Sequence, residues 1–95
     1  RMVTAHRPPA GAAVAFVKGS PGALLERCGA QLRGGGEAPL TDGDRERYLE
    51  LNRELAGDAL RVLGLAYREL PEGHGREDLD RDLVFVGLVG MKYSP

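Results

Sequence analysis

Three stretches of the chain are rich in apolar and β-branched residues, which is the pattern of buried strands. They run from Ala13 to Val17, from Leu60 to Tyr67 and from Asp82 to Met91. A further extended segment, Met2–Arg7, precedes the first of them and is followed by a proline- and glycine-containing turn at residues 8–11. The pattern therefore predicts four strands, the first two of which pair as a hairpin.

Two helices are predicted between these strands. Ser20 and Pro21 suit a helix start, because serine can cap free backbone amides and proline fits the first helical position. We expect this short helix to end at Gly29. A second helix begins at the capping sequence Thr41–Asp44, continues with apolar residues at helical spacing and ends near Gly57.

The remaining segments are predicted to be loops. Gln31–Leu40 contains three consecutive glycines and a proline and would hold at most a short strand, and Leu70–Arg81 is polar and rich in charge. The order of elements, with the helices gathered on one face of a mainly antiparallel sheet, predicts an α+β fold. The length of 95 residues is enough for one domain.

Composition excludes several classes of function. Thirteen basic and 14 acidic residues give a net charge of -1, which argues against nucleic acid or anionic lipid as a partner. No apolar run approaches the roughly 18 residues of a membrane span, so we expect no direct membrane contact. His6 and His74 have no cysteine or histidine at metal-binding spacing, and no metal site is predicted. The single cysteine, Cys28, fits a reducing compartment and a buried, inert thiol.

The segment from Lys18 to Pro21 carries the clearest candidate chemistry. Eleven of the 13 basic residues are arginine, so a lysine at the end of a strand stands out. Gly19 would let a ligand approach the backbone, and the helix start that follows would offer free N–H groups to an anion. The alternative is an ordinary exposed lysine in a strand-to-helix turn. The segment is not a Walker A loop, which needs Gly-Lys followed by a hydroxyl residue.

Three segments together resemble a known family. Val17–Cys28 resembles the lysine-glycine-alanine-proline-glutamate motif of P-type ATPases with the short helix that follows it. Leu60–Arg68 resembles the second signature of the nucleotide-binding domain, and Asp82–Met91 resembles the strand that leads to the hinge with the phosphorylation domain. The segments occur in the family's order, and the calcium- and magnesium-pump branches are the most similar.

The resemblance implies a role for five residues. Lys18 would lie at the mouth of the adenosine pocket, with Gly19 and Ser20 in its wall. Arg61 would approach the phosphates or ribose from the neighbouring strand, and Leu63 would line the pocket. Residues 1–91 would form the C-terminal portion of the nucleotide-binding domain, and residues 92–95 would be either the start of the hinge or an artificial end of the chain.

The chain departs from the family pattern at three places. Gly22 stands where the family usually has glutamate, and Lys92–Pro95 replaces the usual apolar-aspartate-proline-proline hinge. The aromatic residue on which adenine stacks and a second lysine would lie before Arg1. Because stacking is worth about 1–3 kcal/mol per base, we expect this fragment alone to bind ATP weakly if at all.

The resemblance implies that the chain helps to hold ATP, with Mg²⁺, for phosphoryl transfer to an aspartate outside this chain. It would then contain no catalytic residue and be inactive alone, and its partners would be the nucleotide and the phosphorylation, actuator and membrane domains of one cation-transporting ATPase. The fragment would lie on the cytoplasmic side of a membrane. The alternatives are a protein-interaction module that has lost ATP binding and an unrelated α+β module.

Overall fold

The structure is a computed structural model that describes residues 2–6, 13–58, 60–71, 73, 75 and 81–92. Six strands and two helices make up this part of the chain. They are β1 (Met2–His6), β2 (Val14–Gly19), α1 (Pro21–Glu26), β3 (Cys28–Arg33), β4 (Gly36–Pro39), α2 (Asp42–Gly57), β5 (Leu60–Glu69) and β6 (Leu83–Lys92).

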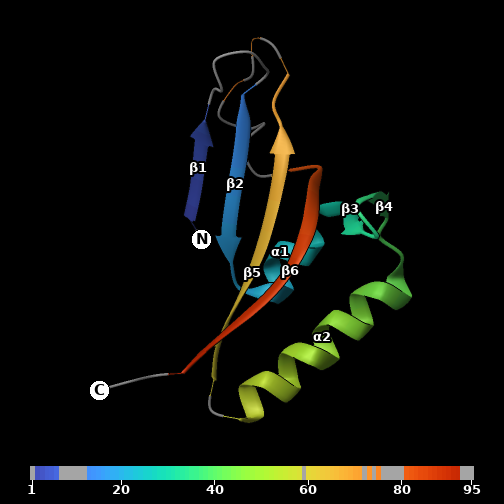
Figure 1. Cartoon of the computed structure of the whole chain (residues 1–95), viewed down its shortest axis with the longest axis vertical. Helices are drawn as coiled ribbons and strands as arrows, with labels where there is room; N and C mark the ends of the chain where they lie inside the picture. Colours follow the sequence, from blue (N-terminus) through green and yellow to red (C-terminus); the bar gives the residue numbers. More distant parts are fainter. Residues whose placement is uncertain are drawn as a thin grey trace.

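The six strands form one sheet in the order β1-β2-β5-β6-β3-β4 (Figure 1). The predicted hairpin of β1 and β2 is confirmed, with Met2 opposite Lys18 and His6 opposite Val14. Every neighbouring pair is antiparallel except β3 and β6, which run parallel. The prediction of a mainly antiparallel α+β fold is therefore confirmed.

Helix α1 ends earlier than the sequence predicts. Its last residue is Glu26 and Arg27 caps it, so the predicted end at Gly29 is wrong. The reason lies in sheet pairing: Cys28 opens β3 opposite Leu83, and the Leu83 amide donates a 3.0 Å hydrogen bond to the Arg27 carbonyl. Backbone groups of residues 27 and 28 thus pair with strand β6, and they are no longer available for the hydrogen bonds of a longer helix.

The prediction of a loop at Gln31–Leu40 is wrong for most of that segment. Strands β3 and β4 pair as a hairpin whose tip consists of Gly34 and Gly35, with φ angles of 61° and 84°. A two-residue hairpin turn of this kind requires positive φ at both central positions, which glycine adopts without steric cost. The glycines that suggested a loop therefore form the turn of a hairpin.

The other boundaries differ little from the prediction. Strand β5 continues to Glu69, and β6 runs from Leu83 to Lys92. In the predicted loop at 70–81, the described residues lie outside helices and strands, whereas 72, 74 and 76–80 fall outside the described part. Arg7, the turn at 8–11 and residues 93–95 also fall outside it, so the hinge remains a prediction.

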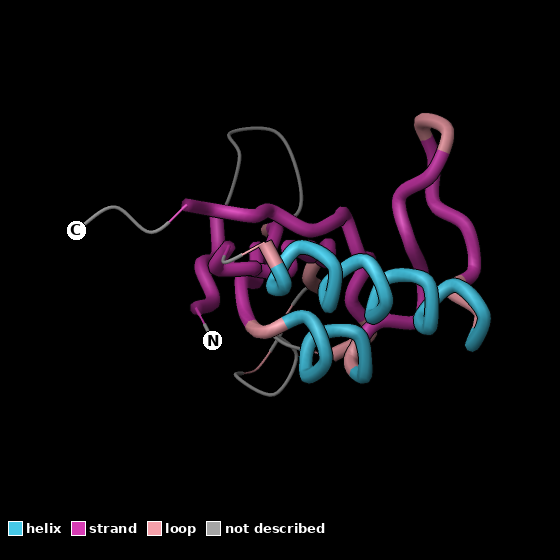
Figure 2. Tube along the Cα trace, turned by 90° about the horizontal axis from the view of Figure 1, so that it is seen from below, coloured by secondary structure: helices cyan, strands magenta, loops and turns pink. Residues whose placement is uncertain are grey.

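The core lies between the sheet and the two helices, which are on the same side of the central strands (Figure 2). Its largest fully buried side chains are Val17, Leu24, Leu25, Leu83 and Phe85. The Tyr48 ring of α2 packs on the ring of Phe85, with 4.7 Å between the ring centroids. Such tilted aromatic pairs contribute beyond the area that they bury.

The N-terminus of α2 is held by a capping box, as predicted. The Thr41 hydroxyl accepts a hydrogen bond from the Asp44 amide, and the Asp44 carboxylate accepts one from the Thr41 amide, each 3.1 Å long. Asp44 also accepts a 2.8 Å bond from the buried Gln31 side chain of β3. The cap therefore joins the helix to the β3–β4 hairpin.

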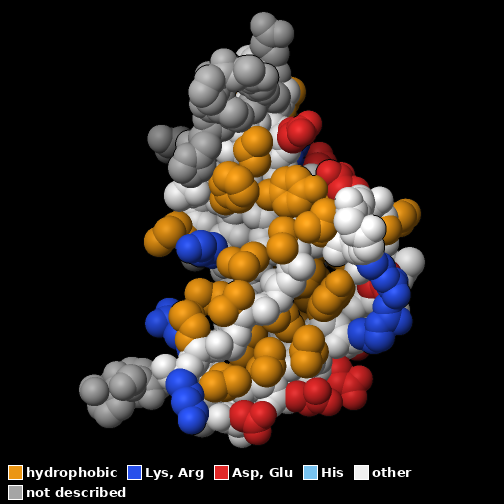
Figure 3. Space-filling model, in the orientation of Figure 1, with side chains coloured by type: hydrophobic (Ala, Val, Ile, Leu, Met, Phe, Trp, Pro, Cys, Tyr) orange, Lys and Arg blue, Asp and Glu red, His pale blue; other side chains and the backbone are white. Residues whose placement is uncertain are grey.

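The opposite face of the sheet carries exposed apolar side chains. Figure 3 shows hydrophobic side chains gathered over β2, β5 and β6 on this face. Phe16, Val86, Val89 and Met91 are each 40–46% exposed. No described helix covers this face, and it is the face toward which Lys18 points, because Lys18 alternates with the buried Val17 along β2.

Candidate functional site

A hollow lies where β2 ends beside β5. The last pair between these strands joins Gly19 to Gly64, whereas β5 begins earlier, at Leu60. Among the described residues, positions 60–63 therefore have a strand neighbour, β6, on one side only. The hollow beside them has a volume of about 470 Å³ and is lined by Met2, Lys18, Gly19, Ser20, Arg61, Val62 and Leu63.

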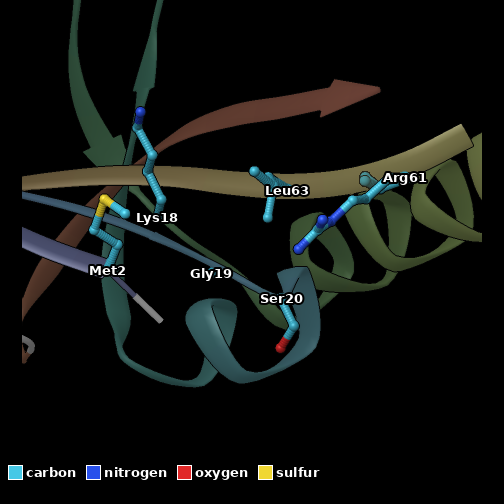
Figure 4. A pocket seen from close by; sticks show the side chains of 7 residues that line it. Met2, Lys18, Gly19, Ser20, Arg61 and Leu63 are labelled. Carbon is cyan, nitrogen blue, oxygen red and sulfur yellow. The ribbon is translucent and has the colours of Figure 1, made fainter. Parts of the chain in front are cut away.

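All five residues that the sequence singled out line this hollow. Figure 4 shows Leu63 between Lys18 and Arg61, with Ser20 below the strand on the turn into α1. Lys18 faces Leu65 in the ladder, so it and Arg61 are four residues apart along β5, or about 13 Å at the usual rise per residue. The two cations thus stand at opposite ends of one surface.

Ser20 is the N-cap residue of α1, but its side chain makes no capping hydrogen bond. The prediction that serine caps this helix through its hydroxyl is therefore wrong. Extended backbone at Ser20, with φ −63° and ψ 136°, turns the chain into the helix, and its carbonyl accepts the bond from Leu24. The side chain is exposed and lines the hollow, so its hydroxyl remains able to bond a ligand.

The hollow is electropositive. Of the described residues that line it, two are basic and none is acidic. Neither Lys18 nor Arg61 has a carboxylate within ion-pair distance in the part of the chain that the structure describes. Cations without a protein partner favour an anionic ligand, and a guanidinium suits phosphate in particular.

Two lining residues were missed by the sequence reasoning. Met2 reaches the hollow because it pairs with Lys18 across the β1–β2 hairpin, and Val62 lies between Arg61 and Leu63. The predicted hairpin contained the signal for Met2, since a partner in a short antiparallel pair shares the face of its neighbour. Together with Leu63, these residues give the hollow an apolar wall.

A second hollow, of about 440 Å³, continues over the open face of the sheet. It shares Lys18 with the first hollow and is otherwise mostly apolar. Its lining residues are Thr4, Phe16, Val17, Lys18, Leu65, Ala66, Tyr67 and Val86. The Tyr67 hydroxyl donates a 2.8 Å hydrogen bond to Glu37, and this bond raises the pKa of Tyr67.

Other candidate chemistry finds no support in the described residues. Within them, no three histidine, cysteine, aspartate or glutamate side chains are grouped as a metal site would require. Burial raises the pKa of the Cys28 thiol to about 11, although the charge of Arg45 acts in the opposite direction. Cys28 therefore stays a neutral thiol near pH 7, and it donates a hydrogen bond to the Leu24 carbonyl.

Neither helix in the described ranges has the length and apolar character of a transmembrane segment.

Comparison with known proteins identifies the family of the chain. The family model for the cytoplasmic domain N of P-type ATPases matches residues 1–95, which is the whole chain. The chain therefore belongs to the P-type ATPase family, and the resemblance seen in its motifs is confirmed.

Similar proteins include several calcium-transporting ATPases. The chain is 37% identical over 81 residues to calcium-transporting ATPase 1 of Bacillus cereus, which covers 84% of the chain and 9% of the relative. It is 35% identical over 79 residues to calcium-transporting ATPase PAT1 of Dictyostelium discoideum, covering 81% of the chain and 7% of the relative. For the endoplasmic reticulum-type calcium-transporting ATPase 3 of Arabidopsis thaliana, identity is 35% over 88 residues, with 86% and 9% covered. The chain thus spans less than a tenth of the length of these relatives.

Proposed function

We propose that this chain is part of the nucleotide-binding domain of a cation-transporting P-type ATPase and that it holds ATP in the hollow beside β5. The observation that carries the proposal is that Lys18 and Arg61, from separate strands, line one hollow in which no described residue is acidic. A nucleotide triphosphate is a polyanion with an apolar, planar base, and it would complement both the two cations and the apolar wall.

In this proposal each residue would contact a different part of the ligand. Lys18 lies at the end of the hollow that continues into the apolar surface around Phe16 and Leu65, and there it would contact the adenosine. Arg61, at the other end, would contact the ribose or the phosphates. Gly19 and Ser20 would form the wall between them, where the exposed Ser20 hydroxyl can donate or accept a hydrogen bond.

Magnesium would reach this site only with the nucleotide. Mg²⁺ prefers carboxylate and phosphate oxygens, and no carboxylate is found among the described residues of the hollow. We therefore assign no magnesium ligand to this chain. In phosphoryl transfer the ion neutralises charge on the phosphates, whereas residues such as Lys18 and Arg61 would fix the position of the nucleotide.

The relatives are named calcium-transporting ATPases. By analogy, the complete protein would couple ATP hydrolysis to the movement of a cation across a membrane. This chain would lie on the cytoplasmic side and supply positioning only, because no segment of it resembles the phosphorylation motif with its aspartate. The other domains of the same ATPase would be its partners. We expect a pure sample of the 95 residues to hydrolyse no ATP, and turnover above a buffer control would contradict this.

An amide-resonance titration with ATP tests the binding site. The isotope-labelled chain, within a longer segment of the gene product, should show shifts at Lys18, Ser20 and Arg61. The amide of Arg53, on the exposed side of α2, serves as the internal control and should not move. An unchanged spectrum at the three hollow positions would instead favour a domain that has lost nucleotide binding and serves protein interaction.

A further inference from the structure

Gly64 lies in β5 immediately after the hollow and directly beneath helix α1. A Cβ atom at this position would lie 2.9 Å from Leu24 Cδ2, 3.4 Å from Pro21 Cα and 3.5 Å from Phe85 Cε1. The first of these separations is closer than packed carbon atoms allow. The first turn of α1 therefore packs on β5 at a point where a methyl group on residue 64 would require the Leu24 side chain to shift.

Space, and not backbone conformation, is what requires glycine here. Gly64 is not among the glycines with positive φ, and it pairs regularly with Gly19 and Leu88 in the sheet. Leu24 is 2% exposed and Phe85 is fully buried, so a shift of either side chain would disturb the packing of the core. An added methyl group would have to displace the helix or force Leu24 from its rotamer.

Gly64 is connected to both walls of the hollow. On its own strand it directly follows Leu63 and comes three residues after Arg61, and across the ladder it faces Gly19. Pro21, whose Cα lies against it, directly follows Ser20. A shift of the first turn of α1 would therefore move the segment from Gly19 to Pro21 relative to the fixed edge of β5.

We propose that Gly64 is a positioning residue for the ligand in this hollow. By letting Leu24 and Pro21 approach β5, it sets the separation between the Gly19–Ser20 wall and Arg61. This inference rests on the proposed nucleotide function, since the ligand whose contacts it sets is the one proposed above.

The test compares ATP affinity in Gly64→Ala, Leu24→Val and the double variant, each made in the complete gene product. We expect Gly64→Ala to raise the Kd for ATP by about fivefold to tenfold, which corresponds to roughly 1–1.4 kcal/mol. Leu24→Val removes the carbon atom nearest to the new methyl group. The Kd of the double variant for ATP should therefore lie within about twofold of the Kd of Leu24→Val alone.

Two controls separate positioning from stability. Gly22→Ala in α1 adds a methyl group that would lie 4.0 Å from Leu49 Cδ2, an ordinary van der Waals distance, and it should leave the Kd unchanged. Leu40→Ala truncates a core residue that lies just before the N-cap of α2, and it should lower the unfolding temperature while the Kd stays the same. All Kd values are measured well below the unfolding temperature of each variant.

The outcomes distinguish this inference from the proposed function. Should wild type bind no ATP, or bind it equally well after Lys18→Met, the proposed function fails and this inference fails with it. Should wild type bind ATP in a Lys18-dependent way while Gly64→Ala binds equally well, only the positioning role is overturned. If Gly64→Ala does not fold, the double variant decides: a Kd more than about fivefold above that of Leu24→Val contradicts the role of the Leu24 contact.

Discussion

Lys18 of β2 and Arg61 of β5 line one hollow although they do not face each other in the sheet, where Lys18 pairs with Leu65. The offset arises because β2 ends at Gly19 and the chain turns into α1, whereas β5 continues past that point. The turn leaves an edge of β5 open, and the two cations border it. A hollow bordered by two cations thus follows from the unequal lengths of two neighbouring strands.

A buried hydrogen-bond network fastens α2 to β3, and we expect it to be needed for stability. The Tyr48 hydroxyl donates a 2.8 Å hydrogen bond to Oε1 of Gln31, which is 2% exposed. Tyr48→Phe would leave that oxygen without its partner and should lower the free energy of unfolding by about 1–2 kcal/mol. Tyr67→Phe is the matched control: its hydroxyl bonds an exposed Glu37, so its loss should cost less than about 0.5 kcal/mol. Urea unfolding of both variants measures the difference, and equal costs would show that the network contributes little.

Acid should weaken the fold through Asp44. Hydrogen bonds from Thr41 are the largest cause that lowers the pKa of this carboxyl, with smaller effects from Gln31 and Arg47. Because the native pKa lies below the unfolded value of about 3.9, the stabilisation is complete above that pH and is lost as pH falls through the native pKa.

Asp44→Asn should therefore flatten the dependence of stability on pH between about pH 5 and pH 2 and should lower stability at neutral pH. Thermal unfolding followed at several pH values gives this profile. Asp58→Asn, an exposed position after α2, should keep the wild-type slope. A slope that is the same in Asp44→Asn as in wild type would contradict the role assigned to Asp44.

The Cys28 thiol should resist alkylation in the folded protein. The Cys28 side chain is 2% exposed, so reagents reach its sulfur poorly. Burial raises its pKa to about 11, so only a small fraction is thiolate at pH 8. We expect iodoacetamide to react with it only as fast as the core opens. Ser20→Cys, combined with Cys28→Ala, places a thiol in the hollow and should react readily, and ATP should slow that reaction. Rapid labelling of native Cys28 would show that α1 does not cover it.

Strand pairing explains where sequence reasoning succeeded and where it failed. The hairpin of β1 and β2 and the capped helix α2 depend on neighbouring residues, and both could be predicted from local patterns. The parallel contact between β3 and β6 joins residues far apart in the chain and has no local signal. That contact ends α1 at Glu26, which is why the helix was predicted to be too long.

The candidate site likewise combines residues that could be selected from the sequence with an arrangement that could not be predicted from it. Lys18 was selected because it is one of two lysines and lies at the end of a strand, and Arg61 because its segment resembles a family motif. The register that offsets the two residues is visible only in the sheet. Gly64 illustrates the limit more sharply. The sequence contains 14 glycines, and nothing local distinguishes the one that lies under Leu24 from those at turns or on the surface.

The most direct test of the account is the affinity of the complete gene product for ATP after loss of each cation. Lys18→Met and Arg61→Met should each raise the Kd by about tenfold or more, since charge-assisted contacts are worth roughly 1.5–3 kcal/mol. Arg53→Met, which removes the same charge from the exposed side of α2, should leave the Kd unchanged. Binding of ATP by both hollow variants with the wild-type Kd would contradict the proposal that this hollow holds the nucleotide.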